Sequence, residues 1–162
     1  MHLYRLDDTN YPDYQRCVRK IEYSYSKKGE PQFPYAALFA ELTKNEVCPK
    51  PEFIKYVNDP NIEIYCLRNE DGKNMGLACI QFKKREAHID EFALLNPYKG
   101  QGNGKAFYKM ILEESIYPRR CKEITLNCPF AGAQEFWIKQ GFHFVDSISM
   151  RGPYPLMRKK LR

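Results

Sequence analysis

The stretch that decides the fold is Leu94-Leu95-Asn96-Pro97-Tyr98-Lys99-Gly100-Gln101-Gly102-Asn103-Gly104-Lys105. Three glycines recur at every second position between the end of a strand pattern and the start of a helical pattern. Glycine lets the backbone approach a ligand closely and adopt dihedral angles closed to other residues. Amides at a helix N-terminus bind phosphate, because they lack internal partners and stand at the positive end of the helix dipole. We therefore expect this turn to bind a phosphate group, with Lys99 and Lys105 adding charge at its rims.

Two better-known glycine-rich turns do not match this spacing. A dinucleotide-binding turn needs a further glycine at a set distance after Gly104, and none follows. A Walker loop needs Ser or Thr after its lysine, but Ala106 follows Lys105, and no glycine lies five positions before Gly104. The alternative to a phosphate-binding turn is an ordinary turn that begins a helix and binds no ligand.

The elements before this turn predict an antiparallel meander. Residues 62–67, 75–82 and 87–95 are rich in strand-forming residues, and polar turns at 69–74 and 83–86 separate them. Upstream, we expect a short strand and three helices, over residues 3–6, 11–25, 35–45 and 51–58.

The elements after the turn alternate between helix and strand. A helix is expected over residues 104–116, with one apolar face and with Pro118 closing it. Gly141 suits the position just after a second helix. The remaining elements are a strand at 123–127, a helix at 131–139, a strand at 142–150, and an edge strand at 154–160 because Pro155 interrupts it.

This order predicts a single α/β domain over residues 1–162. Its mixed, mostly antiparallel sheet should have about six or seven strands flanked by helices. The strand–helix–strand unit across residues 87–128 should form a right-handed crossover between parallel strands.

Composition limits the classes of function. No apolar run is long enough to span a membrane, and the N-terminus lacks the layout of a signal peptide, so we expect a cytoplasmic protein. The net charge of +6 favours an anionic partner, which a phosphate-bearing coenzyme or a nucleic acid would satisfy. The six cysteines form no Cys-x-x-Cys pair and the three histidines are scattered, so we expect free thiols and no metal.

Two signatures of this sequence resemble the GNAT superfamily of N-acetyltransferases. The family's pyrophosphate loop reads Arg/Gln-x-x-Gly-x-Gly/Ala, and Lys99 stands where Arg or Gln is usual. The family's last helix ends in Tyr-x-x-x-Gly-Phe, and this chain has Trp137-Ile138-Lys139-Gln140-Gly141-Phe142. The resemblance covers about residues 60–150, and the first 60 residues match the family's variable, substrate-binding region.

The resemblance implies a GNAT-like fold and an acetyl-CoA-dependent N-acyltransferase in which an amine attacks the thioester directly. The fourth strand should splay from the fifth, and the pantetheine arm should pair there with the backbone of Leu94 and Phe92. The pyrophosphate should bind the amides of Gly100, Gln101, Gly102, Asn103, Gly104 and Lys105. The alternative is a non-catalytic module that senses acetyl-CoA.

This sequence departs from the family at the position of the general acid. Trp137 replaces the tyrosine that protonates the leaving thiolate, and an indole N–H is a very poor acid. Tyr98, Tyr108 or water is then the proton source. The family's helix-opening asparagine aligns near Phe130, so we expect Asn127, or Cys128, to contact the coenzyme instead.

The catalytic base is expected on the strand before the glycine turn. Glu91 is the first choice and Asp90 the second, because the family often carries an acidic residue here. Strict alternation places His88 and Asp90 on one face and Glu91 on the other, although a bulge would change this. We interpret His88 as an ordinary strand residue.

The acceptor is expected to be a small-molecule or peptide amine. Five aromatic residues lie where the family forms its acceptor pocket, although core packing also accounts for them: Tyr23, Tyr25, Phe33, Tyr35 and Phe39. A homodimer is the default expectation. Nucleic acid is not expected as a partner. The third hypothesis for the function is nevertheless a nucleic-acid-binding protein, because residues 158–162 form a cationic tail.

Overall fold

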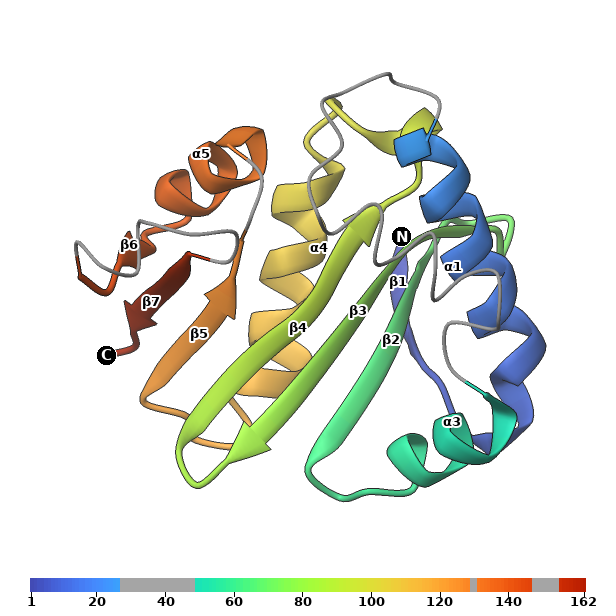
Figure 1. Ribbon diagram of the computed structural model, residues 1–162, viewed down its shortest axis with the longest axis horizontal. Helices are drawn as coiled ribbons and strands as arrows, with labels where there is room; N and C mark the ends of the chain where they lie inside the picture. The colour runs from blue at the N-terminus through green and yellow to red at the C-terminus, as the bar shows by residue number, and fades with distance from the viewer. Residues whose placement is uncertain (27–48, 129–130, 147–154) are drawn as a thin grey trace.

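A computed structural model describes residues 1–26, 49–128, 131–146 and 155–162. The described strands form one seven-stranded mixed sheet in the order β1-β2-β3-β4-β5-β7-β6 (Figure 1). Among them, β4 and β5 are the parallel pair, and the other neighbours are antiparallel. The strands are β1 His2–Arg5, β2 Ile62–Arg68, β3 Asn74–Lys83, β4 Glu86–Leu94, β5 Glu123–Asn127, β6 His143–Phe144 and β7 Leu156–Lys160. The predicted meander and mixed sheet are confirmed.

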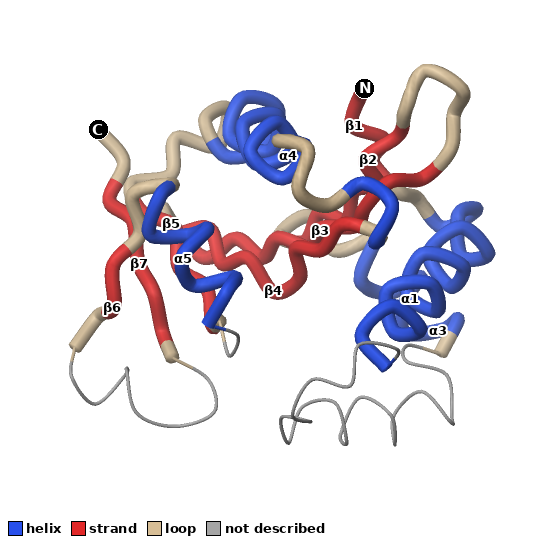
Figure 2. Tube along the Cα trace, turned by 90° about the horizontal axis from the view of Figure 1, so that it is seen from above, coloured by secondary structure: helices blue, strands red, loops and turns tan. Residues whose placement is uncertain are grey.

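The helices cover both faces of the sheet. Figure 2 shows α4 (Asn103–Ile111) on one side and α1 (Tyr11–Ser26) with α3 (Lys50–Val57) on the other. The helix α5 (Ala131–Lys139) packs in the same apolar cluster as α4. The helix expected at residues 35–45 lies outside the described residues. None of the described helices is long and apolar enough to cross a membrane.

Both faces of β2 are buried, which explains its nearly continuous apolar sequence. Ile64 belongs to the cluster under α1 and α3, whereas Tyr65 and Leu67 belong to the cluster under α4. Side chains of a strand alternate between its two faces, so β2 connects two separate hydrophobic cores.

A π-helical turn, Leu112–Ile116, ends α4 and contacts a buried carboxylate. Ser115 Oγ donates a hydrogen bond to Glu63, and Tyr65 Oη donates another at 2.8 Å. Arg119 adds two more, from Nε at 3.0 Å and Nη2 at 2.8 Å. Burial raises the pKa of Glu63, but these hydrogen bonds outweigh it and leave the pKa below its ordinary value. The network fixes the end of α4 to β2.

The predicted edge position of the last strand is wrong. β7 lies between β5 and β6, and Met157 on it is fully buried. Pro155 precedes the first residue of β7, and its carbonyl accepts the N–H of Cys128 at 2.9 Å. The proline therefore interrupts no hydrogen bond of the strand ladder. Of the strand expected over 142–150, residues 142–146 are described and only His143–Phe144 form a strand, β6, while residues 147–150 lie outside the described ranges.

Candidate functional site

The parallel strands β4 and β5 separate along their length. They pair over four positions, from Glu86 opposite Glu123 to Ile89 opposite Leu126. β4 then continues for five residues to Leu94, while β5 ends one residue later at Asn127. Figure 1 shows the ends of the two strands diverging, with α4 behind them. The expected splay is present.

The β4 backbone directs hydrogen-bonding groups into this gap. The N–H of Leu95 donates to the carbonyl of Met75 on the β3 side at 2.8 Å. Backbone groups of successive residues in a strand point to opposite edges, so those of Leu94 and Phe92 point away from β3. They face the gap between β4 and β5, as the resemblance implied for these two residues.

The glycine turn lies between the end of β4 and the start of α4. Gly100 and Gly102 have φ angles of +74° and +79°, which residues with a Cβ rarely adopt. A Cβ at either glycine would meet nothing within 4 Å. These two glycines are therefore required by backbone conformation, and no atom of the described residues fills the space beside them.

The side chains of Gln101 and Asn103 close the turn. Gln101 Nε2 donates to the carbonyl of Pro97 at 2.9 Å, and Asn103 Nδ2 donates to that of Tyr98 at 3.0 Å. Within the described part of the chain, the backbone N–H groups of residues 100–105 donate to no carbonyl. Side chains thus hold the loop in shape while the main-chain amides stay available to an anion.

Gly104 has a different role from its two neighbours. Its φ is not positive, and a Cβ placed on it would lie 3.4 Å from the ring of Phe136 and 3.7 Å from Leu94. It permits close packing of α4 against α5. Lys99 is half-buried and Lys105 is exposed.

An aromatic cluster fills the space between α4 and α5. Trp137 is buried and packs edge-on against Phe92, Tyr108, Phe136 and Phe142. Trp137 is therefore a core residue of this cluster. Tyr108 is also buried, and burial raises its pKa. Its hydroxyl lies 3.5 Å from Lys159 Nζ.

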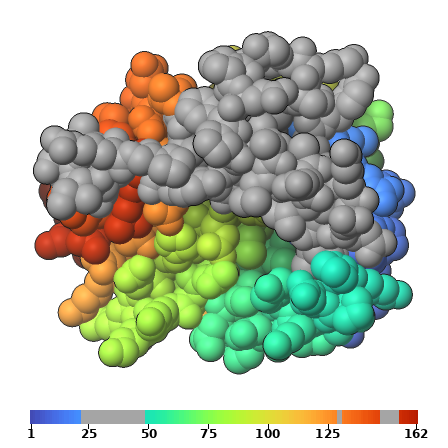
Figure 3. Space-filling view, in the orientation of Figure 1, coloured from blue at the N-terminus to red at the C-terminus, as the bar shows by residue number. Residues whose placement is uncertain are grey.

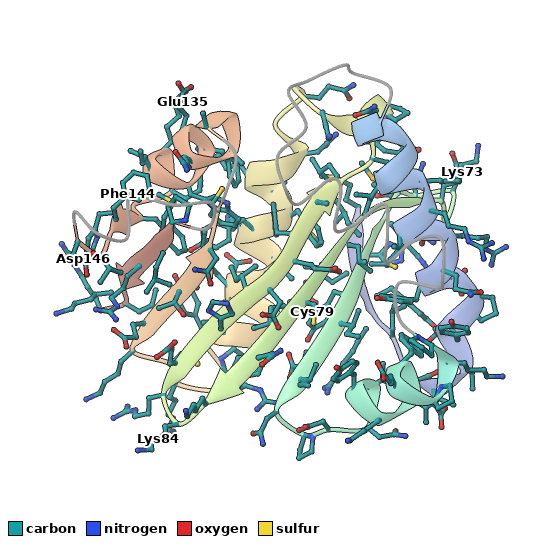
Figure 4. The ribbon with its side chains drawn as sticks, in the orientation of Figure 1. Lys73, Cys79, Lys84, Glu135, Phe144 and Asp146 are labelled. Carbon is teal, nitrogen blue, oxygen red and sulfur yellow. The ribbon has the colours of Figure 1, made fainter. Side chains whose placement is uncertain are left out.

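A β-bulge at Asp90 changes the face on which Glu91 lies. β3 pairs Cys79 with Glu91 but Ile80 with Ile89, so Asp90 is the extra residue. Cys79, labelled in Figure 4, and Glu91 therefore share a face, and this face also carries Asp90 and His88. The strict alternation that separated Glu91 from Asp90 is wrong, and the bulge left open as the alternative is present, where it shifts the register by one residue.

His88 makes contacts that sequence analysis missed. Its Nδ1 lies 2.8 Å from Thr125 Oγ1 on β5, and its Nε2 lies 3.5 Å from Asp90 Oδ1. Thr125 Oγ1 in turn donates to Glu86 Oε1 at 2.7 Å. The sequence carries no signal for these contacts, because they depend on the register of the parallel pair.

Other predicted residues lie at the edge of the site or beyond the described ranges. Asn127 is exposed at the end of β5, and Cys128 is buried, its carbonyl accepting from Gln134 Nε2 at 2.8 Å. Phe130 lies outside the described residues. So do the side chains of the five aromatic residues expected to line the acceptor pocket: Tyr23, Tyr25, Phe33, Tyr35 and Phe39.

A basic groove lies at the opposite end of the sheet. The turn between β3 and β4, which carries Lys84 in Figure 4, meets the segment after α4 and the end of β7. The N–H of Lys122 donates to the carbonyl of Arg85 at 2.7 Å, and the N–H of Leu161 donates to that of Lys122 at 2.7 Å. The cationic side chains that line this basic groove are Lys83, Lys84, Arg85, Arg120, Lys122, Lys160 and Arg162. Figure 3 shows the β3–β4 part of this end in yellow-green.

The diverging strands and the glycine turn define a mixed-sheet protein whose main-chain amides at the start of α4 face away from the described carbonyl groups. The chain belongs to the acetyltransferase (GNAT) family, whose model matches residues 21–142. No curated protein sequence matches it significantly.

Solved structures of acetyltransferases share the fold at low sequence identity. PaiA N-acetyltransferase from Thermoplasma acidophilum, solved in complex with coenzyme A, superposes with a TM-score of 0.76 at 15% identity, over 99% of this chain and 98% of that one. A GNAT-family acetyltransferase from Staphylococcus aureus gives 0.70 at 9% identity, over 99% of both chains. Tetrahymena GCN5 gives 0.63 at 16% identity, over 100% of this chain and 97% of that one.

Proposed function

We propose that this protein is an acetyl-CoA-dependent N-acyltransferase. The observation that carries the proposal is the set of free amides at residues 100–105, placed where β4 leaves β5. Membership of the GNAT family supports the same chemistry.

Each part of the coenzyme has a matching part of the site. The pyrophosphate would bind the amides from Gly100 to Lys105, with Lys99 and Lys105 contributing charge. The pantetheine arm would extend the sheet in the gap, bonded to the backbone of Leu94 and Phe92. Asn127 lies at the end of β5 beside the gap, and Trp137 would contribute apolar contact through the aromatic cluster that it shares with Phe92.

The reaction would be direct attack of a neutral amine on the thioester carbonyl carbon. The C–N bond forms, the C–S bond breaks with its electron pair going to sulfur, and the amine loses a proton. The carboxylates of Glu91 and Asp90 lie on the same face of β4 beside the gap and are candidate proton acceptors. Burial raises the pKa of Asp90, which makes it a better base than an exposed aspartate. Water or Tyr98 would protonate the thiolate, because Trp137 is a very poor acid and burial raises the pKa of Tyr108.

Two measurements test the proposal in sequence. Titration calorimetry and thermal shift with acetyl-CoA test binding, and no response at millimolar ligand would remove the proposal. A panel of small-molecule and peptide amines, with detection of the released thiol, then tests transfer. Tight binding without turnover on any amine would instead favour the alternative, a non-catalytic acetyl-CoA sensor.

The basic groove favours a second candidate activity, binding of a polyanion such as RNA. Seven cations from three segments line it, against the two carboxylates Glu86 and Glu123. Binding to RNA should weaken steeply with salt and should persist in Gly102→Glu. Salt-insensitive binding, or no binding, would remove this candidate.

A further inference from the structure

Four side chains of β4 and β5 form a continuous chain that ends at the gap between these strands. They are Glu86, Thr125, His88 and Asp90. We propose that His88 is the proton acceptor of the acyl transfer, and that Thr125 and Glu86 are positioning residues that hold its ring. The proposal rests on the proposed function and assigns one step of it to a residue.

The hydrogen bonds determine where His88 carries its proton. An ionised carboxylate only accepts, so at 2.7 Å the Thr125 hydroxyl donates its hydrogen to Glu86. The Thr125 oxygen then accepts at 2.8 Å from His88 Nδ1, which must carry a hydrogen. In the neutral ring this leaves the lone pair on Nε2, the nitrogen that a proton acceptor needs.

The position of His88 places Nε2 at the base of the gap. The pair formed by His88 and Thr125 lies one position before Ile89 and Leu126, where the strands part. Thr125 is buried, while the His88 side chain is 29% exposed. The orienting contact is thus made to a buried hydroxyl, while part of the His88 side chain remains exposed. The described helices on this face, α1 and α3, pack over residues of β2 and β3.

Charged side chains lie on both sides of the His88 ring. Asp90 Oδ1 lies 3.5 Å from Nε2, and Glu86 is reached through Thr125. On the other side, β7 places Arg158 opposite Thr125, but Arg158 Nε lies 3.4 Å from Glu123 and its charge is balanced there. Asp90, and Glu86 through Thr125, are therefore the carboxylates next to the ring.

The step balances without another reactant. The amine nitrogen bonds to the carbonyl carbon and gives its proton to His88 Nε2, while the C–S electron pair goes to sulfur. The thiolate then takes a proton from water, and the imidazolium returns its own to solvent. This assignment revises the expectation that His88 is an ordinary strand residue and that Glu91 is the first choice of base.

A spectroscopic experiment tests the orientation without any substrate. Long-range ¹H–¹⁵N spectra of the full chain at alkaline pH should show His88 as the Nδ1-protonated tautomer, with His2 and His143 as internal references. Thr125→Val should abolish this preference, and Thr125→Ser should restore it. A wild-type ring protonated at Nε2, or an unchanged tautomer in Thr125→Val, would overturn the proposal.

A kinetic experiment tests the role in transfer, with an amine from the panel above. His88→Gln should lower kcat by about 100-fold, and added imidazole should recover part of the rate. Thr125→Val should lower kcat by about tenfold and alter its pH profile, while Thr125→Ser recovers most of the rate. His143→Gln on β6 is the matched control and should change neither.

The outcomes separate this proposal from the proposed function. If the wild-type protein fails to bind acetyl-CoA in calorimetry, or turns over no amine, the proposed enzyme is wrong and this assignment fails with it. If binding and turnover are present but His88→Gln leaves kcat and its pH profile unchanged, only the assignment to His88 is wrong.

Discussion

Asn103 Nδ2 lies 3.0 Å from the carbonyl oxygen of Tyr98 and closes the turn that precedes α4. The first residue of the helix is thereby bonded back to the short 3-10 segment that follows β4. The Asn103 side chain thus closes the turn without using its main-chain amides, which remain available to a ligand.

Asn103→Ala should weaken acetyl-CoA binding without unfolding the protein. Loss of one hydrogen bond costs about 1 kcal/mol, so the dissociation constant should rise by about fivefold as the turn loosens. Calorimetry checks the affinity. Gln15→Ala, which removes a side-chain amide bonded to Tyr11 on α1, is the control and should leave affinity unchanged. Equal affinity of Asn103→Ala and wild type would contradict this role for the side chain.

Gly102→Glu should abolish acetyl-CoA binding while the fold survives. The substitution places a carboxylate in open space beside the free amides, where it would repel the pyrophosphate. It also forces a residue with a Cβ into φ +79°, at a cost of about 1–2 kcal/mol. Calorimetry should show no heat of binding at the acetyl-CoA concentrations that saturate the wild type. Gly132→Glu in α5, at another open glycine without positive φ, is the control and should bind normally.

Gly76→Ala should destabilise the protein where β3 meets the end of β4. The new Cβ would lie 2.6 Å from the carbonyl oxygen of Ala93 and 2.9 Å from the Leu94 side chain. A backbone carbonyl cannot yield as a flexible side chain does, so we expect a loss of about 1–3 kcal/mol in unfolding free energy. Urea denaturation measures it, with Gly132→Ala as the control. A loss of unfolding free energy below about 0.5 kcal/mol would contradict the close contact of Gly76 with the β4 backbone.

Glu63→Gln should lower the unfolding free energy by about 3 kcal/mol, because it leaves Arg119 without its buried partner. Glu113→Gln, in an exposed pair with Lys109, is the control and should cost less than about 0.5 kcal/mol.

The same carboxylate makes stability depend on pH. The folded-state pKa of Glu63 is lowered, so its contribution is complete above the unfolded value of about 4.3 and is lost as pH falls through the folded pKa. Denaturation curves measured from neutral to acid pH should show a steeper loss of stability for wild type than for Glu63→Gln. Parallel losses in the two proteins would contradict the network.

The local patterns of the sequence predict most of the fold. The meander, the strand at 123–127 and the helix at 131–139 match the structure because alternation, turn residues and the glycine at 141 act over a few neighbouring positions. The glycine turn is also a local pattern. The spacing of its three glycines is enough to predict that residues 100–105 carry the exposed main-chain amides.

Features that depend on register could not be predicted in this way. The resemblance to the family left a bulge open on this strand, but no residue near Asp90 marks its position or shows that it moves Glu91 to the face of His88. The contact between His88 and Thr125 joins residues 37 positions apart, and it forms only because β4 and β5 pair in one particular register. The interior place of β7 likewise depends on which strand it joins, whereas Pro155 suggested an edge.

The most direct test of the account follows the main-chain amides themselves. Two-dimensional ¹H–¹⁵N spectra recorded during titration with acetyl-CoA should show large shifts of the Gly100, Gly102 and Gly104 amides, because charged phosphate oxygens would bond to them. The amide of Gly132 should stay in place. Saturable binding of acetyl-CoA that leaves the amides of residues 100–105 unmoved would contradict the assignment of the coenzyme to this turn.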